Sequence, residues 1–242
     1  GSWNVSASDQ NERLGPRYDV MMRGVGPMAL QVQMLFLTDW AFEGDSPRNE
    51  TDLFPDMQPA GEDIAQIVPS DPLVESAPVR DTAQFLINHS RERVVLVTPY
   101  FIPDEPVELA LCMAARRGVE VNVVVPASSD LRFVDAATRS YCRVCAKAGV
   151  QTHFFTPGFL HAKVLLVDGV IAMVGSANFD NRSFRLNLET NVVVYSPSVI
   201  NYVRKIQEYY IRHSVGMRKA HVSRSHHRRL GEDLARLVSP LL

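Results

Sequence analysis

The sequence predicts an α/β protein with a mixed β-sheet flanked by helices, and three observations support that class. Short runs of β-branched and other apolar residues alternate with longer segments of helical spacing, as in layered α/β folds. The pair Asp168-Gly169 separates two apolar runs and predicts a hairpin, so at least two strands are antiparallel. A hydrophobic content of 46% over 242 residues is enough for a sizeable core and one or two domains.

The elements follow in chain order from periodicity and from the glycines and prolines that interrupt it. Residues 18–23 resemble a strand and residues 28–42 a helix, and the acidic, Pro- and Gly-rich range 44–63 is expected to be a surface loop. After this loop we expect strands at 64–68, 94–98, 119–125, 150–155, 164–167, 170–174 and 190–195, and helices at 79–90, 105–117, 133–148 and 199–213.

Composition narrows the classes of function. The net charge of -2 gives no global basic field, so no nucleic-acid partner is expected. No apolar run approaches the ~20 residues of a membrane span, and no secretory signal is recognised. Three cysteines fit a reducing compartment; Cys142 and Cys145 have CxxC spacing but lie in an expected helix, so we interpret them as structural, and Cys112 as a core residue.

The stretch from His161 to Asn178 carries the chemistry. On an extended strand His161 and Lys163 project from the same face, because they are two residues apart. The hairpin at Asp168 returns the chain and brings Ser176 and Asn178 beside His161. A nucleophile, a positive charge and two small hydrogen-bonding groups then converge, as displacement at phosphorus requires when no metal is present.

This stretch reads His-x-Lys-x-x-x-x-Asp-Gly and then Gly-Ser-x-Asn, and it resembles the His-Lys-Asp motif of the phospholipase D superfamily. Segments that resemble the bacterial cardiolipin synthase branch are Tyr100 to Glu105, Gly158 to Leu160, and Asn181 to Asn187 with Glu189 and Asn191. The resemblance covers nearly the whole chain. It implies a phospholipase D-like layered fold and a phosphatidyltransferase that converts two phosphatidylglycerol molecules to cardiolipin and glycerol, without a cofactor or metal.

The resemblance also implies a role for each site residue. His161 attacks the phosphodiester and forms a phosphohistidine, while Glu189 accepts a hydrogen bond from the other ring nitrogen. The lysine and the asparagine hold the non-bridging oxygens, with the serine assisting. Asp168 belongs to the family motif, but a carboxylate at a hairpin turn suits a role in holding the shape of the site. The expected catalytic residues are His161, Lys163, Asp168, Asn178 and Glu189, and the expected phosphate ligands are Lys163, Ser176 and Asn178.

The beginning of the chain repeats part of this pattern. Gly1-Ser2-Trp3-Asn4 matches Gly175 to Asn178, and a strand-like and a helix-like segment follow both. We interpret this as an internal repeat whose first copy lacks its His-Lys-Asp part; the alternative is that Gly1-Ser2 remains from cloning and the match is chance. Family enzymes use a second histidine as acid and base, so the expected partner is the missing N-terminal half, a separate chain, or a second copy paired across a two-fold axis.

The chain thus divides into a remnant of the first half plus linker at 1–63, a second phospholipase D-like domain at 64–215, and a tail at 216–242. The tail combines Arg218, Lys219, Arg224, Arg228 and Arg229 with Leu230, Leu234, Leu237, Val238 and Leu241 at helical spacing. This composition suits either an anionic membrane surface or a helix docked on its own domain.

The expected substrate is a phospholipid, phosphatidylglycerol, at the bacterial inner membrane on its reducing cytoplasmic side. An acyl chain needs an apolar entrance, for which Phe159, Leu160 and Phe184 are candidates, with core packing as the alternative. The competing functions are hydrolysis by a phospholipase or other phosphodiesterase, and lipid binding without catalysis.

Overall fold

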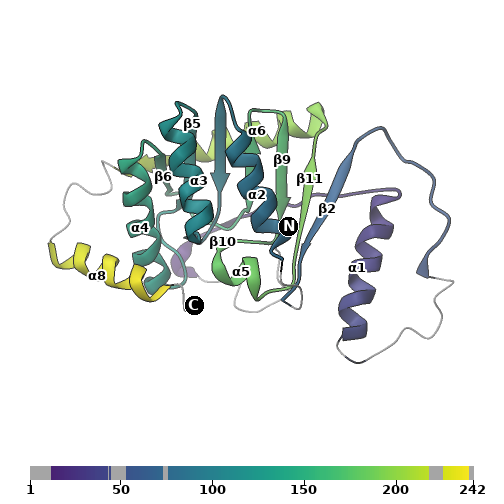
Figure 1. The fold of residues 1–242 in the computed structure, drawn as a ribbon, viewed down its shortest axis with the longest axis horizontal. Helices are drawn as coiled ribbons and strands as arrows, with labels where there is room; N and C mark the ends of the chain where they lie inside the picture. The colour runs from purple at the N-terminus through teal and green to yellow at the C-terminus, as the bar shows by residue number, and fades with distance from the viewer. Residues whose placement is uncertain (1–11, 43, 45–52, 73–75, 218–225, 240–242) are drawn as a thin grey trace.

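Figure 1 shows the computed structural model, which describes residues 12–42, 44, 53–72, 76–217 and 226–239. An eight-stranded sheet forms its centre, in the order β12-β6-β5-β3-β8-β9-β11-β2. The pairs β3–β5 and β5–β6 are parallel, and the other neighbours are antiparallel, so the sheet is mixed. Its strands are β2 (Ala65–Ser70), β3 (Arg93–Val97), β5 (Glu120–Pro126), β6 (Gln151–Phe155), β8 (Val164–Val167), β9 (Ile171–Gly175), β11 (Glu189–Val194) and β12 (Ser214–Gly216).

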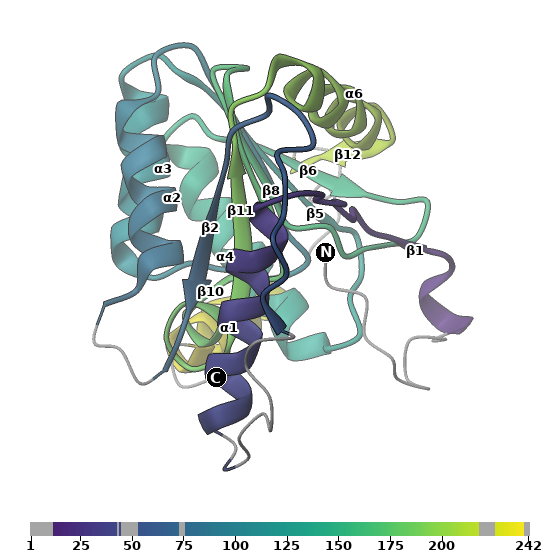
Figure 2. The same ribbon diagram turned by 90° about the vertical axis from the view of Figure 1, so that its right-hand side faces the viewer.

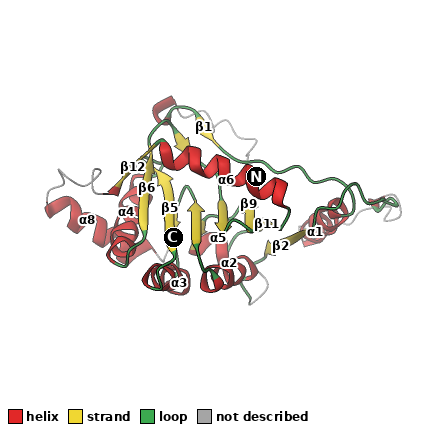
Figure 3. Cartoon of the chain, turned by 90° about the horizontal axis from the view of Figure 1, so that it is seen from above, coloured by secondary structure: helices red, strands yellow, loops and turns green. Residues whose placement is uncertain are grey.

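Helices cover both faces of this sheet (Figure 3). Three helices, α2 (Pro78–His89), α3 (Glu105–Arg116) and α4 (Arg132–Lys147), lie on one face, and α6 (Pro197–Arg212) lies on the other. The remaining helices of the described residues are the 3₁₀ turn η2 (Glu12–Leu14), α1 (Met28–Phe42), α5 (Asn181–Arg185) and α8 (His226–Val238). Two small parallel pairs, β1 (Arg17–Tyr18) with β7 (Phe159–Leu160) and β4 (Phe101–Ile102) with β10 (Phe179–Asp180), lie outside the main sheet.

The two covered faces explain the unbroken apolar run of β8. Leu165 and Val167 belong to the core under α2, α3 and α4, whereas Val164 and Leu166 belong to the core under α6. A strand that is buried on both sides needs no polar alternation. Gln207 of α6 is also buried, and its amide donates to two backbone oxygens of the sheet, at 3.1 and 3.4 Å, which fixes the helix on that face.

The predicted secondary structure is confirmed for most of the chain. The helix at 28–42 matches residue for residue, and the other helices and strands expected after residue 63 end within two residues of their predicted bounds. The strand expected at 18–23 is wrong, because only Arg17–Tyr18 forms a strand. Its partner β7 is itself only two residues long and ends directly before the motif begins at His161. The pattern at residues 1–4 lies outside the described residues.

One helix stands apart from these layers. In Figures 1 and 2, α1 lies beyond the edge strand β2 rather than over a face of the sheet. None of its side chains is buried, although it is rich in apolar residues such as Met34, Phe36 and Phe42. Of the helices within the described ranges, none is both long enough and apolar enough to cross a bilayer.

Candidate active site

A two-residue strand pair brings the first described residues against the motif. β1 pairs with β7 in parallel, and the backbone N–H of His161 continues this pairing by donating to the oxygen of Tyr18 at 2.7 Å. Arg17 and Asp19 flank Tyr18, and alternate residues of an extended segment share a side. Their side chains therefore both reach the ring of His161.

The ring of His161 and three charged side chains around it form a cluster of four groups. Nδ1 of His161 lies 3.0 Å from Oδ2 of Asp19, 2.8 Å from Nζ of Lys163 and 2.6 Å from Nη2 of Arg17. The lysine ammonium also lies 3.0 Å from Nε2 of the ring and donates to the backbone oxygen of His161 at 2.6 Å. The structure thus confirms that His161 and Lys163 face the same spot.

The contact with Asp19 selects a tautomer of His161. Because a carboxylate can only accept, the contact with Asp19 favours the tautomer with the proton on Nδ1, which leaves the lone pair on Nε2 for attack; Lys163 and Arg17, which also lie near Nδ1, then act on the ring through their charge and not as hydrogen-bond donors to that atom. Burial lowers the pKa of His161, and the charges of Lys163 and Arg17 add to this against the opposing effect of Asp19. Burial alone would raise the pKa of Asp19, but the hydrogen bond from His161 and the charge of Lys163 hold that pKa below its ordinary value. Near pH 7 the pair is therefore a neutral imidazole and a carboxylate.

Lys163 is the most deeply buried of the four groups, with 4% of its surface exposed. Burial lowers the pKa of its ammonium to about 7; the charges of Asp19, Glu189 and Asp180 oppose this, and that of Arg17 adds to it. A lysine with such a pKa gains a proton when a negative charge enters the site. The cluster therefore has the electrostatics of an anion-binding site.

Asp168 lies at the opposite end of β8. Its two carboxylate oxygens accept three hydrogen bonds, each 2.9 Å long, from the backbone N–H groups of Arg91, Glu92 and Arg93. Since β8 rises by about 3.3 Å per residue, Asp168 is roughly 17 Å along the chain from Lys163. Its contacts favour the predicted role in holding the shape of the site over a role in proton transfer, because they anchor the turn at the far end of the strand that follows His161 and Lys163.

Two of the expected phosphate ligands have other partners. The hydroxyl of Ser176 accepts from the backbone N–H of Thr190 at 3.0 Å and lies 3.4 Å from the oxygen of the same residue. This ties the end of β9 to β11 and favours a structural role for Ser176. The amide of Asn178 hydrogen-bonds the carboxyl of Asp180, while its buried Oδ1 has no hydrogen-bond partner among the described residues.

The expected contact between Glu189 and His161 is wrong. The carboxylate at the ring is that of Asp19, while Glu189 accepts a hydrogen bond from Asn187 at 3.1 Å. Glu189 acts on the cluster only through its charge, which raises the pKa of Lys163. The reason is topological, because the β1–β7 pair places the first part of the chain, and not β11, beside the ring.

Sequence reasoning missed Arg17 and Asp19, although the chain holds a signal for the second of them. One offset of 170 residues relates Asp19 to Glu189 and Pro27 to Pro197, and each proline precedes or begins a helix of similar length. The internal repeat that the sequence predicts would make Asp19 the counterpart of Glu189. No comparable signal marks Arg17.

An apolar cavity of about 330 Å³ lies beside Asn178. It is lined by Tyr100, Ile102, Leu131, Val134, Asn178, Asp180, Asn181, Arg182, Ser183, Asn187 and Ser239. Of the three residues considered for an acyl entrance, Leu160 and Phe184 are fully buried in the core. Phe159 is half-buried, with its ring centre 5.4 Å from that of His161, so it alone stays a candidate.

This fold and this cluster define a class. The structure is similar to that of Nuc, a phospholipase D family member from Salmonella typhimurium, with a TM-score of 0.55, 22% identity, and coverage of 64% of this chain and 98% of that one. It is also similar to phosphatidylserine synthase from Haemophilus influenzae, with a TM-score of 0.59, 16% identity, and coverage of 74% and 48%. The fold is therefore that of the phospholipase D superfamily.

Sequence comparison gives the particular family. Residues 85–211 match the family described as "Cardiolipin synthase, PLD-like domain", and the chain belongs to this family. It is 36% identical over 234 residues to a cardiolipin synthase of Oceanobacillus iheyensis and 38% identical over 254 residues to cardiolipin synthase A of Pseudomonas aeruginosa. These alignments cover 96% and 100% of this chain but 49% and 50% of the relatives, so the chain spans about half the length of the curated relatives it matches.

Proposed function

We propose that this chain is the second half of a phosphatidyltransferase that makes cardiolipin and glycerol from two molecules of phosphatidylglycerol. The observation that carries the proposal is the group of His161, Asp19, Lys163 and Arg17, which combines a neutral imidazole with two cations. The family membership supports the same reaction, because its named relatives are cardiolipin synthases.

In the first step, Nε2 of His161 attacks phosphorus, and the bond from phosphorus to the glycerol oxygen breaks. The product is a phosphatidyl group on His161, and Asp19 stabilises the positive charge that the ring then carries. Lys163 and Arg17 bind the non-bridging oxygens as negative charge builds on them. In the second step, the hydroxyl of another phosphatidylglycerol attacks phosphorus and releases the histidine.

Both steps also need a group that moves a proton. The leaving glycerol oxygen must gain one, and the incoming hydroxyl must lose one. We assign this task to a second histidine in the missing N-terminal half. By the repeat, Glu189 then supports that histidine as Asp19 supports His161.

The exposed helix α1 supports the assignment to a missing half. Its counterpart α6 buries Ile200 and Val203 against the sheet of this domain. In contrast, α1 has no buried residue and exposes Met34 by 61%, Phe36 by 50% and Phe42 by 58%. A helix that is apolar on several sides needs a covering surface, and the sheet of the first half would provide one for α1 as this sheet does for α6.

A phospholipid substrate places the reaction at a membrane surface. We propose the bacterial inner membrane, with this domain on its cytoplasmic side. The three free and buried cysteines suit a reducing compartment.

The test joins this chain to the first half of the Pseudomonas aeruginosa relative and supplies phosphatidylglycerol. Cardiolipin with an equal amount of glycerol supports the proposal. Phosphatidic acid as the product would assign hydrolysis, and a folded protein that binds lipid without any product would assign a binding role. We expect the isolated chain to have little or no transferase activity, and robust turnover by a confirmed monomer would contradict the need for two histidines.

A further inference from the structure

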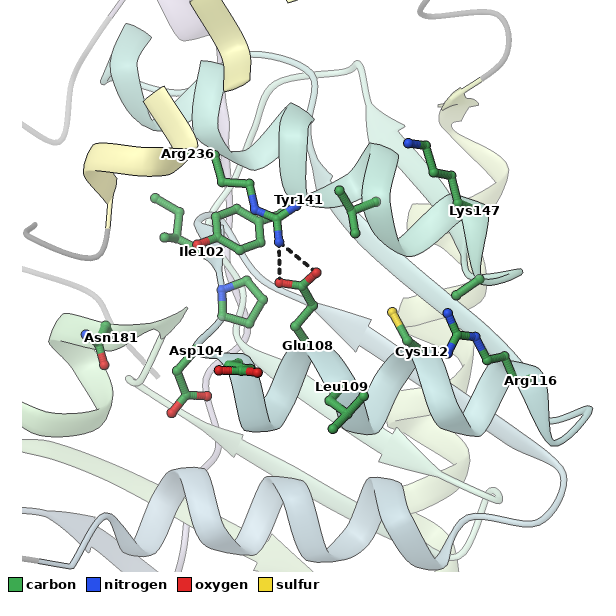
Figure 4. Close-up of a pocket in the computed structure, with 14 residues that line it drawn as sticks. Ile102, Asp104, Glu108, Leu109, Cys112, Arg116, Tyr141, Lys147, Asn181 and Arg236 are labelled. Atoms are coloured by element: carbon green, nitrogen blue, oxygen red, sulfur yellow. Dashed lines mark hydrogen bonds and ion pairs between the residues drawn. The ribbon is translucent and has the colours of Figure 1, made fainter. Parts of the chain in front are cut away.

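Helix α8 docks on the domain through its polar side. Figure 4 shows Arg236 reaching from α8 to Glu108 of α3, with both nitrogen–oxygen contacts at 2.7 to 2.8 Å, and its guanidinium lies 4.3 Å from the ring centre of Tyr141. Glu232 and Asp233 both pair with Arg143 of α4. Arg236, Glu108 and Tyr141 also line a cleft of about 740 Å³ between α3, α4 and α8.

The apolar side of α8 consequently faces outward. Leu230 is 59% exposed, Leu234 54%, Leu237 76% and Val238 50%. Their spacing of three and four residues aligns them along the helix, and we call them the α8 stripe. The amphipathic pattern of the tail and the docking of its helix on the domain are thus confirmed. The docked side is the charged one, with Glu232, Asp233 and Arg236 paired against the domain, and the leucines are not covered.

The α8 stripe lies at the same end of the sheet as the proposed site. Ser239, which follows the helix directly, lines the 330 Å³ cavity together with Asn178. Leu131, which lines that cavity too, is 52% exposed, and Leu186, next to the cavity residue Asn187, is 65% exposed. Exposed apolar residues therefore lie at or next to the cavity, and the C-terminal end of the stripe leads directly to its lining residue Ser239.

We propose that the α8 stripe inserts into the surface of a bilayer that contains anionic phospholipid and so holds the cavity mouth against the source of its substrate. This proposal rests on the proposed function, because it assumes a phospholipid substrate and adds that the protein meets this substrate in a bilayer. Charge complementarity favours a bilayer over a protein partner. Arg229 is exposed beside the stripe, and the sequence just before it is strongly basic, which suits an anionic lipid surface.

The docked side of α8 explains how the stripe is oriented. Ion pairs to α3 and α4 prevent the helix from turning its leucines inward, because Glu232 is buried and its carboxylate needs Arg143. The helix is thus held with its apolar side outward before any lipid is met. A flexible tail would lose this orientation and would have to order itself on binding.

The test measures binding of this chain to vesicles of equal parts phosphatidylglycerol and phosphatidylcholine, and to vesicles of phosphatidylcholine alone. The variant Leu230→Gln/Leu234→Gln/Leu237→Gln keeps good helix formers and the docked side, so its thermal unfolding should match that of the unaltered chain. We expect its affinity for the mixed vesicles to fall at least about tenfold. The matched control is Phe85→Gln/Val170→Gln/Tyr202→Gln, three apolar residues exposed elsewhere, which should bind within about twofold of the unaltered chain.

A second measurement does not depend on the triple variant. In Leu237→Trp, brominated lipid in the mixed vesicles should quench the added fluorescence, whereas in Val170→Trp it should not. His161→Ala should bind the vesicles normally. Vesicle binding therefore tests the α8 stripe independently of the catalytic proposal. The proposal is overturned if the unaltered chain binds neither kind of vesicle, if the triple variant binds equally well, or if the stripe holds two copies together and the triple variant converts a dimer to monomers.

Discussion

The two ends of strand β8 carry the same motif but have different tasks. At its beginning, burial lowers the pKa values of both His161 and Lys163. At its end, Asp168 has a positive φ of 52° and fixes three successive backbone N–H groups of another segment. The difference teaches that one motif can contain both reactive and structural residues. Strand β8 keeps His161 and Lys163 in position only if the turn at Asp168 is anchored.

The largest expected effect is at the reactive end. In the protein that joins both halves, His161→Ala should reduce cardiolipin formation by at least about 10³-fold, because it removes the proposed acceptor of the phosphatidyl group. Urea unfolding checks that the variant stays folded, because the loss of a side chain that is 12% exposed should cost on the order of 1 kcal/mol. A phosphorylated His161 trapped after rapid quenching would support its role as the nucleophile directly. An active His161→Ala enzyme would contradict that role.

At the anchoring end, Asp168→Gly should lower the free energy of unfolding by about 2 to 3 kcal/mol, because it removes the acceptor for three N–H groups and keeps the freedom for positive φ. Asp168→Asn, which keeps one oxygen, should lose less. Burial alone would raise the pKa of Asp168, but the three N–H donors hold it below its ordinary value. Its contribution is therefore present above the unfolded pKa of about 3.9 and fades as the pH falls through the lowered one. If an Asp168 variant kept its stability but no longer bound an anion, Asp168 would belong to the reactive end and not to the anchoring end.

Local features of the site can be predicted from the sequence, whereas the contacts that come from distant parts of the chain cannot. Helices, the hairpin and the shared face of His161 and Lys163 follow from local periodicity, and the structure has them. The β1–β7 pair does not follow, because two residues carry no periodic signal and their partners are about 140 positions away, so Arg17 was missed. The sequence predicted the leucine pattern of α8 but left its orientation open for a similar reason: the partners of its charged side, Glu108 and Arg143, lie on other helices.

A smaller effect concerns the charge of Lys163. Sulfate keeps a constant charge between pH 6 and 9, so its affinity for this chain reports on the protein alone. Because the pKa of Lys163 lies at about 7 and a bound anion raises it, sulfate affinity should be constant below that pH and fall by up to about tenfold per pH unit above it. Calorimetry in two buffers should show proton uptake on binding above pH 7. Lys163→Arg should remove the pH dependence while keeping affinity, and an unchanged profile in that variant would place the titrating group elsewhere.

The smallest expected effect separates the two carboxylates that the repeat relates. Asp19 raises the pKa of His161 through its hydrogen bond and its charge, so Asp19→Asn should lower the histidine pKa measured by NMR titration. Glu189→Gln should leave the histidine nearly unchanged and should instead lower the pKa of Lys163, which its charge supports. Both variants replace a carboxylate by its amide, so each serves as the control for the other. If Glu189→Gln moved the histidine more than Asp19→Asn did, the carboxylate of β11 would be the partner of His161 after all. The proposal that Asp19 supports His161 while Glu189 supports the histidine of the other half would then have no support. That proposal requires Asp19, from the first part of the chain, to set the pKa of His161.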